Sequence, residues 1–183
     1  MESRQLFVSD QILMKEIGED EVENIFNAID AERDYLSEWL PFVEKTTDIE
    51  FTRGFVNSYL YSDKKDVTFA IYFEQRFAGL IGLKDTDEMN MKTEIGYWLS
   101  YDFQHKGIMT KCCKALIAYA FENMKMNRVQ LKAGTENVRS RAVAERLGFA
   151  LEGIERDGEL HSRGYIDLAV YSLLKRDFLA SDC

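Results

Sequence analysis

Proline and long apolar runs are nearly absent from this chain of 183 residues. Pro41 is the only proline, and no stretch rich in glycine or serine marks a linker, so nothing in the sequence divides the chain. No apolar run approaches the length of a membrane-spanning helix, and the start, MESRQLFVSDQ, lacks a signal-peptide pattern. We therefore expect a single domain over residues 1–183 and a cytoplasmic location.

Cysteine and histidine are also scarce. Cys112 and Cys113 are adjacent and Cys183 is the last residue, which excludes a disulfide framework and a C-x-x-C motif. One cysteine serving as a nucleophile or redox sensor is an alternative, but small helix-packing residues and a loose terminal thiol are favoured. His105 and His161 are expected in loops and have no metal-ligand partner at usable spacing, so no metal site is expected.

Positive charge is in deficit. The formal net charge is −9, which argues against a general nucleic-acid binder and suits a basic or amine-bearing partner. An apolar content of 46% with 30% charged residues is typical of a folded globular protein.

Hydrophobic periodicity predicts alternating strands and helices. Strands are expected near Leu6–Val8 and Ile12–Glu16, followed by a helix with an acidic first turn from Glu19 and a second helix that begins near Asp48 and carries Phe51, Phe55, Val56 and Tyr59. The later strands are expected in the segments VTFAIYFE, FAGLIGLKD, TEIGYWLSY, NRVQLKAGT, FALEGIERDGEL and GYIDLAVYSLL, the first two forming a hairpin that turns at Gln75–Arg76. Helices are expected over 107–125 and in ENVRSRAVAERLGF. This order, ββααβββαβαββ, describes an α/β mixed sheet with helices on its faces.

The segment YDFQHKGIMT joins a strand to a helix through a basic loop. A helix N-terminus offers unpaired N–H groups, and Gly107 lets the backbone approach a ligand closely. Lys106, Lys111 and Lys114 make a local basic island, which predicts a phosphate-bearing ligand. The alternative is that Gly107 only permits the turn while the lysines coat a helix. Walker and dinucleotide glycine patterns are absent.

In order and spacing, EIGYWLSYDFQHKGIMTKCCKAL, VQLKAGTENVRSRAVAERLGF and LEG…GELHSRGYIDLAVYSLL resemble the GCN5-related N-acetyltransferases, the GNAT family. Within that family the chain is similar to the branch that acetylates the N-termini of ribosomal proteins. The resemblance implies the GNAT fold: a mixed, mostly antiparallel central sheet with splayed middle strands and helices on both faces. It also implies acetyl-CoA as the acetyl donor, with no metal.

The resemblance places the cofactor on backbone amides of a loop and on the end of the preceding strand. In the family a Q/R-x-x-G-x-G/A loop holds the pyrophosphate; here Met109 stands where Gly or Ala is usual. Asn137 matches an asparagine that binds the cofactor arm, and it also suits a helix N-cap. The implied cofactor-binding residues are Trp98, Leu99, Ser100, Gln104, His105, Lys106, Gly107, Ile108, Met109 and Asn137.

The resemblance also implies catalytic residues. Ser140 matches a serine that protonates the leaving sulfur, the alternative being a helix-surface serine. Glu159 matches a general base whose pKa a dry cleft would raise, the alternative being a solvated loop charge. Tyr171 matches an acid of other branches but is better explained as a core aromatic.

The predicted function is transfer of an acetyl group from acetyl-CoA to a primary amine, most plausibly the N-terminal α-amine of a ribosomal protein, by direct attack in a ternary complex. Alternatives are an acetyltransferase for a small amine such as a polyamine, a non-catalytic acyl-CoA-binding module on the same fold, and a plain interaction domain. Acceptor specificity is expected around Tyr35–Pro41 and in loop 158–164. Trp39 and Phe42 are expected to be exposed, where they would roof the acceptor cleft or form a homodimer contact.

Overall fold

The computed structural model describes residues 4–62 and 65–181. It divides into two compact units. The first takes the described residues up to Gly82 together with Tyr97–Cys112, and the second takes Leu83–Gly96 together with the described residues from Cys113 onward. A single domain over residues 1–183 stays a prediction. Cys183 lies outside the described residues.

The elements follow the predicted alternation. In chain order they are β1 (Gln5–Ser9), β2 (Ile12–Glu16), η1 (Glu19–Glu21), α1 (Val22–Ala31), α2 (Arg33–Leu36), η2 (Pro41–Lys45), α3 (Ile49–Leu60), β3 (Val67–Phe73), β4 (Arg76–Asp87), β5 (Lys92–Leu99), η3 (Tyr101–Phe103), α4 (Ile108–Glu122), β6 (Arg128–Gly134), α5 (Val138–Arg146), β7 (Ala150–His161), β8 (Gly164–Leu174) and α6 (Lys175–Ser181). The eight strands pair in the order β1-β2-β3-β4-β5-β6-β8-β7, with mixed and mostly antiparallel neighbours. The predicted α/β class with a mixed sheet is confirmed.

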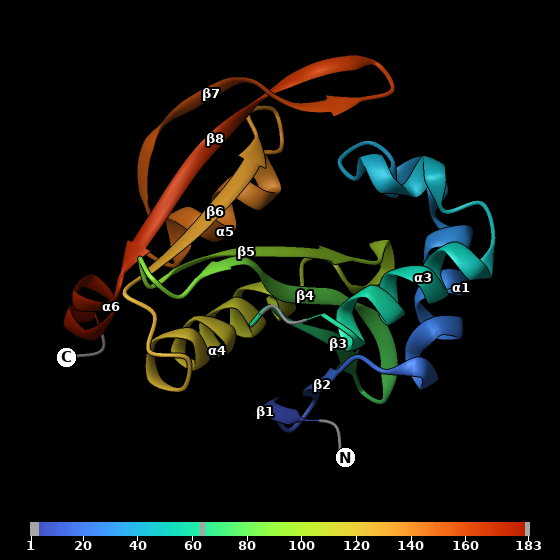
Figure 1. The fold of residues 1–183 in the computed structure, drawn as a ribbon, viewed down its shortest axis with the longest axis horizontal. Coiled ribbons are helices and arrows are strands. Elements are labelled where there is room, and N and C mark those ends of the chain that lie inside the picture. Colours follow the sequence, from blue (N-terminus) through green and yellow to red (C-terminus); the bar gives the residue numbers. More distant parts are fainter. Residues whose placement is uncertain (1–3, 63–64, 182–183) are drawn as a thin grey trace. The chain divides into compact units, whose positions relative to one another are not determined.

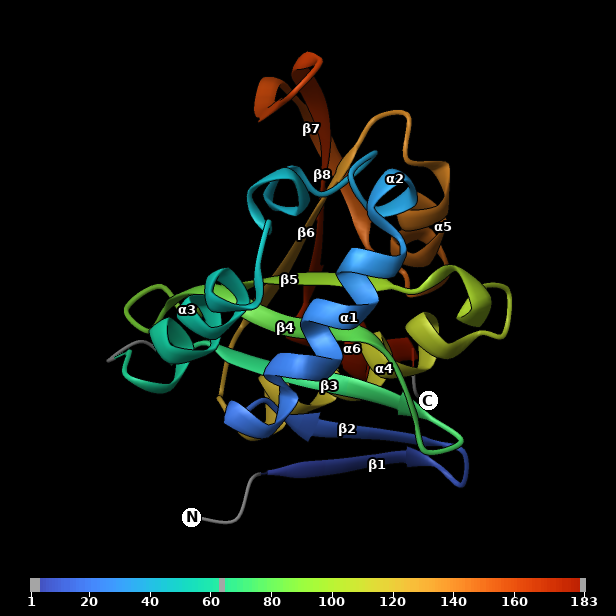
Figure 2. The same ribbon diagram turned by 90° about the vertical axis from the view of Figure 1, so that its right-hand side faces the viewer.

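In the first unit, α1 and α3 lie over the strands β3 and β4 (Figure 2). β1 pairs antiparallel with β2, and β2 pairs antiparallel with β3. The helix spacing seen in the sequence explains this packing, because Val22, Ile25 and Ile29 of α1 are at most 3% exposed. Asp48 caps α3 by accepting the amide hydrogens of Glu50 and Phe51 on its side chain.

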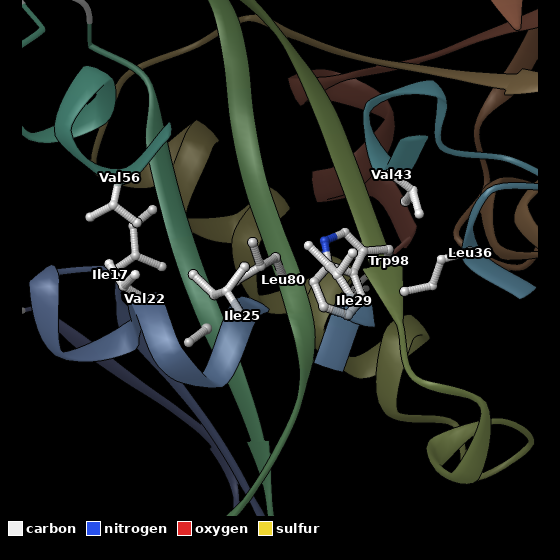
Figure 3. Packing of buried hydrophobic residues seen from close by; sticks show 10 residues of the cluster. Ile17, Val22, Ile25, Ile29, Leu36, Val43, Val56, Leu80 and Trp98 are labelled. Atoms are coloured by element: carbon white, nitrogen blue, oxygen red, sulfur yellow. The ribbon is translucent and has the colours of Figure 1, made fainter. Parts of the chain in front are cut away.

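The apolar core of this unit joins these helices to the strands. Figure 3 shows Ile25 and Ile29 of α1 next to Leu80 of β4 and Trp98 of β5, while Val56 of α3 lies next to Ile17. At roughly 25 cal/mol per Å² of buried apolar surface, side chains of this size each contribute about 1.5–3 kcal/mol to folding. The core therefore fixes the end of β5, where the loop leading to α4 begins.

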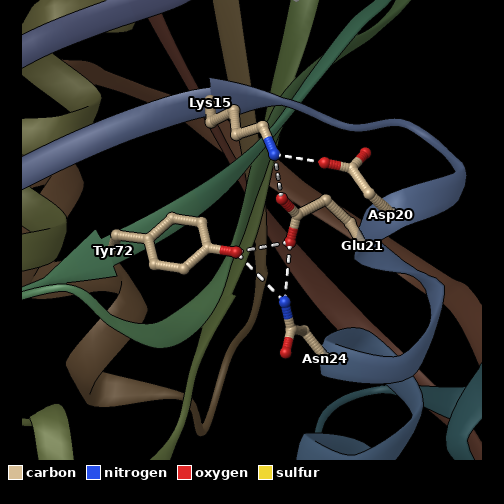
Figure 4. A network of polar contacts seen from close by, with 5 residues as sticks. All are labelled: Lys15, Asp20, Glu21, Asn24 and Tyr72. Carbon is tan, nitrogen blue, oxygen red and sulfur yellow. Dashed lines mark hydrogen bonds and ion pairs between the residues drawn. The ribbon is translucent and has the colours of Figure 1, made fainter.

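A buried polar network ties the same elements together (Figure 4). The carboxylate of Glu21, 1% exposed, accepts hydrogen bonds from the Tyr72 hydroxyl at 2.6 Å, from Lys15 at 2.9 Å and from Asn24 at 3.1 Å. Lys15 also pairs with Asp20. These hydrogen bonds, with Asp20 and then Glu21, raise the pKa of Lys15. A carboxylate this deeply buried is tolerated because each oxygen has partners.

In the second unit, β7 and β8 form a long antiparallel hairpin beside β6, with α5 next to β6 (Figure 1). β5 pairs parallel with β6 from Lys92↔Arg128 to Ile95↔Leu131. The hairpin register shifts between Glu155, which lies opposite Leu168, and Glu159, which lies opposite Ile166. This bulge bends β7 before the segment that carries the predicted base.

Several local expectations needed correction. The turn after β3 is made by Glu74 and Gln75, both with positive φ, rather than by Gln75 and Arg76. Phe51 and Phe55 of α3 are each 41% exposed, so the buried face of that helix is formed by Thr52 and Val56. Trp39 is half-buried rather than exposed. The short helices η2 and α6 were not predicted, because segments of five and seven residues show too few turns for periodicity.

Within residues 4–62 and 65–181, no helix combines the length and apolar character of a membrane span.

Candidate active site

The end of β5 is held very close to β4. A Cβ built on Gly79 would lie 2.2 Å from the carbonyl oxygen of Trp98, and Gly79 has φ +153. The Ser100 N–H donates to the carbonyl of Ala78 at 2.8 Å. Backbone polar groups alternate sides along a strand, so Trp98 and Ser100 both direct theirs toward β4. Of the three predicted positions, Leu99 is the one whose N–H and C=O point to the other side.

The loop after β5 is anchored at its start. The Tyr101 N–H donates to Glu32 Oε2 at 2.9 Å, and the Tyr101 ring meets that of Tyr35 edge-on at 5.5 Å. The Phe103 ring, 4% exposed, packs against Phe73 at 6.2 Å. The segment at the end of α1 thus contacts the base of the loop, which no local pattern in the sequence indicates because the bonded residues are 69 positions apart.

Two cations lie on the aromatic base of the loop. Lys106 Nζ lies 5.4 Å from the ring centroids of both Phe73 and Phe103. The Arg76 guanidinium lies 5.0 Å from the Phe103 centroid. Cations over aromatic faces gain electrostatic stabilisation, which holds positive charge near the loop. Sequence reasoning identified Lys106 and missed Arg76, which is remote in sequence.

The backbone of the loop has the conformation that a turn into a helix requires. His105 has φ 59 and Gly107 has φ 71, both in the left-handed region. A Cβ on Gly107 would meet no atom within 4 Å, so open space lies over this residue. The first intrahelical bond runs from Lys111 N–H to Gly107 O at 3.2 Å, and the amides of Ile108 and Met109 precede it.

The unusual residue Met109 does not crowd the exposed side of the loop. Its side chain is 8% exposed and that of Ile108 is 1% exposed, so both are directed into the protein. His105, Lys106 and Gly107 are exposed. The loop therefore fits a phosphate-bearing group: accessible backbone, a helix N-terminus of a 15-residue helix and nearby cations.

Asn137 and Ser140 are brought together at the start of α5 in the second unit. Asn137 is the N-cap residue, and its Oδ1 accepts the Ser140 N–H at 3.1 Å. This bond fixes the Asn137 side chain against the Ser140 backbone, because an Asx N-cap bonds two or three residues ahead. The Asn137 amide nitrogen remains the donor on that side chain, and Ser140 is half-buried.

Tyr171 is a core residue, as favoured from the sequence. It is 1% exposed on β8, and its hydroxyl accepts a hydrogen bond from Arg141 Nε at 3.0 Å. Arg141 also donates to the Thr135 carbonyl at 2.9 Å. These two hydrogen bonds of Arg141 hold the start of α5 against the end of β6.

Glu159 lies on β7 beside a histidine. Its Oε2 is 2.8 Å from His161 Nε2; the Glu159 side chain is 41% exposed and that of His161 only 7%. The placement of His161 in a loop was wrong, because it is the last residue of β7 and pairs with Gly164. The 158–164 segment is likewise mostly strand rather than loop. Residues two apart on a strand share a face, which brings these side chains together.

Lys84 on β4 contributes positive charge near Glu159. Its Nζ lies 2.9 Å from Glu94 Oε1. Partial burial of the Lys84 side chain lowers its pKa. The carboxylates around it, Glu94 first and Glu159 among them, raise that pKa by more. Lys84 therefore stays charged.

The two cysteines of α4 pack in the interior. Cys112 is 0% and Cys113 1% exposed, and burial raises the pKa of Cys112 to about 12. A thiol that stays protonated is a poor nucleophile, which confirms the packing interpretation for these two residues. No group of three or more His, Cys, Asp or Glu in the described part of the chain is arranged to hold a metal ion.

A loop with an accessible backbone, a helix N-terminus and nearby cations is an arrangement suited to a phosphate-bearing ligand. Comparison with known proteins gives the family. An acetyltransferase (GNAT) domain model matches residues 11–150. The chain belongs to the GNAT acetyltransferase family, and it is an acetyl-CoA-dependent N-acetyltransferase.

Named relatives match along nearly the whole chain. YdaF of Bacillus subtilis (strain 168), named by inference as a ribosomal N-acetyltransferase, is 35% identical over 93% of this chain and 95% of its own. The ribosomal-protein-serine acetyltransferase of Escherichia coli (strain K12) is 28% identical over 90% of this chain and 93% of its own. Among solved structures, RimL, a ribosomal L7/L12 alpha-N-protein acetyltransferase in complex with coenzyme A, matches with a TM-score of 0.90 at 25% identity, covering 96% of this chain and 99% of that one.

Proposed function

We propose that this enzyme acetylates the N-terminal α-amine of a protein, with a ribosomal protein as the first candidate, by direct attack within a ternary complex. The observation that carries the proposal is the likeness to two relatives named for ribosomal substrates, each covering at least 90% of both chains. The solved structure of RimL, which acts on L7/L12, supports the same acceptor class.

The first unit would hold the donor. Backbone amides from Gln104 to Met109 would bind its pyrophosphate, with Lys106 and Arg76 adding positive charge. Leu99 is the position on β5 whose backbone faces away from β4 and would pair with the pantetheine arm. When bound, acetyl-CoA supplies an acetyl group activated as a thioester.

Asn137, Ser140 and Glu159 are the side chains proposed for the cofactor arm and for proton transfer. The Asn137 amide would bind the cofactor arm while its oxygen holds the α5 N-terminus. Ser140 Oγ would donate a proton to the leaving sulfur. Glu159 would take the proton of the attacking amine on Oε1, since Oε2 already contacts His161.

The acceptor is tested with peptides matching the N-termini of ribosomal proteins, compared with the same peptides carrying a blocked α-amine and with polyamines. Mass spectrometry locates the added acetyl group. We expect label on the free α-amine and none on the blocked peptide. Label confined to a lysine side chain or to spermidine would overturn the α-amine assignment.

The catalytic roles are tested on the preferred acceptor. Ser140→Ala and Glu159→Gln are each expected to lower kcat about 10²-fold or more while leaving the KM for acetyl-CoA within a few fold. Wild-type turnover by both variants would refute the assignment. Intersecting initial-rate lines support a ternary complex, whereas parallel lines would indicate an acetyl-enzyme.

A further inference from the structure

The hydrogen bond between Glu159 and His161 carries a further inference, which rests on the proposed role of Glu159 as the base. The bond is 2.8 Å from Nε2 to Oε2 and joins an accessible carboxylate to an enclosed imidazole. A base that is to take up a proton accepts at its carboxylate, so in the proposed role of Glu159 the imidazole donates from Nε2. We infer that His161 is a positioning residue that orients the Glu159 carboxylate through this bond.

The exposure of the two groups decides which of them meets the acceptor. The Glu159 side chain is 41% exposed and that of His161 is 7% exposed. Glu159 is therefore the member of the pair that an incoming amine can reach, and Oε2 is the oxygen that contacts the imidazole. In this arrangement the amine proton moves to Oε1, and no bond to His161 is made or broken.

The hairpin gives the pair a defined geometry. Glu159 lies opposite Ile166 and His161 lies opposite Gly164, next to the turn. His161 has its backbone fixed by the ladder and its ring largely enclosed, so its rotamer freedom is small. A carboxylate bonded to such a ring loses less entropy when it reaches its working orientation than a free glutamate does.

A charged group on another strand also acts on Glu159. Lys84 of β4 attracts Glu159 and is held by Glu94 of β5 at 2.9 Å, with Asp85 beside it. On β8 the paired positions, Ile166 and Gly164, do not titrate, and Tyr165 between them is 63% exposed. His161 is thus the donor that contacts the carboxylate directly, and Lys84 acts at longer range.

Substitutions at position 161 separate hydrogen bonding from packing. His161→Gln keeps an N–H donor within reach of Oε2, whereas His161→Phe keeps a ring and removes the donor. We expect His161→Gln to retain kcat within about threefold and His161→Phe to lose about tenfold, with an unchanged KM for acetyl-CoA.

Controls make the result specific. Arg156→Gln removes an exposed charge from the same strand and is expected to leave the rate unchanged. Circular dichroism and thermal midpoints establish that each variant is folded, and His161→Leu is the second donor-free variant if His161→Phe fails to fold. The rates are measured on whichever amine the acceptor panel identifies.

Two results would overturn the inference. One is a wild-type rate in a folded donor-free variant. The other is an equal loss of kcat in His161→Gln and His161→Phe, which would indicate packing alone. Failure of the proposed function looks different: Glu159→Gln then keeps wild-type turnover, or no protein α-amine is acetylated by any variant.

Discussion

At the scale of single residues, Gly79 is in close contact with the end of β5, just before the segment Gln104–Met109 that is proposed to bind the cofactor. A methyl group on Gly79 would lie 2.2 Å from the Trp98 carbonyl oxygen and 2.9 Å from the Leu99 Cα. Both are backbone atoms, so the strand itself must move. We expect Gly79→Ala to lower the free energy of unfolding by about 1–3 kcal/mol, as overpacking does, and to weaken acetyl-CoA binding, measured by urea unfolding and calorimetric titration.

Gly54 provides the matched control. It lies exposed within α3, and a Cβ there would meet nothing within 4 Å. Gly54→Ala is expected to stabilise the protein by about 0.5–1 kcal/mol, because alanine is the better helix former. If Gly79→Ala were as stable as the wild type and bound acetyl-CoA equally well, the close approach of β4 and β5 would not constrain the site.

The lowered pKa of Glu152 is expected to make the folding stability of the second unit partly sensitive to acid. Hydrogen bonds from Arg128, at 2.6 Å, and then from Ser172 lower the pKa of Glu152 to about 2. A lowered carboxylate pKa stabilises the fold above the unfolded value, near 4.5, and this stabilisation is lost as pH falls from about 4.5 to about 2. The side chain is 42% exposed, so screening limits the contribution to about 0.2–1 kcal/mol.

The measurement is urea unfolding at pH 7, 5 and 3. Glu152→Gln is expected to be less stable than the wild type at pH 7 and to approach it at pH 3. Glu88→Gln, which removes an exposed carboxylate of the β4–β5 connection, serves as the control. A stability difference between Glu152→Gln and the wild type that is independent of pH would contradict this explanation.

At the scale of elements, Tyr72 joins β3 to the first turn of α1 through Glu21. Its hydroxyl donates to Glu21 at 2.6 Å and accepts from Asn24 at 3.1 Å, and burial followed by that carboxylate raises the pKa of Tyr72. Tyr72→Phe leaves the buried carboxylate short of a donor. We expect a loss of about 1–3 kcal/mol in unfolding free energy.

Tyr61→Phe removes the same hydroxyl from a side chain that is 84% exposed, and it is expected to change stability by less than about 0.5 kcal/mol. Denaturant unfolding of the two variants side by side measures the difference. Equal stabilities would mean that water replaces the Tyr72 hydroxyl at no cost.

The order of elements could be predicted because each long segment has a clear period. α1 and α4 bury residues at three- and four-residue spacing, and β3 and β8 are apolar between turn residues. What periodicity cannot supply is pairing between distant segments. Predicting the Glu159–His161 bond requires knowing that residue 161 is still in a strand. Predicting the Glu32–Tyr101 bond requires knowing the tertiary fold.

At the scale of the whole molecule, ligand binding offers a direct test of the loop. A ligand that binds only the folded state stabilises it by about 2.7 kcal/mol at one hundred times its Kd. We expect acetyl-CoA to raise the Tm by several degrees, with NAD as a control that does not. Replacing Lys106 by glutamine is expected to reduce the shift, since that cation lies 5.4 Å over both loop aromatics. A Tm unmoved by acetyl-CoA in protein free of copurified ligand would refute the assigned loop.

Burial of the α4 thiols has a practical consequence for measuring turnover. Acetyl transfer releases a free thiol on coenzyme A, which colour-forming disulfide reagents detect continuously. Cys112, with its pKa near 12, and Cys113, 1% exposed, should consume almost none of such a reagent in the folded enzyme. With Cys183 replaced by serine, the background of the assay would report unfolding, and the signal above it would report catalysis.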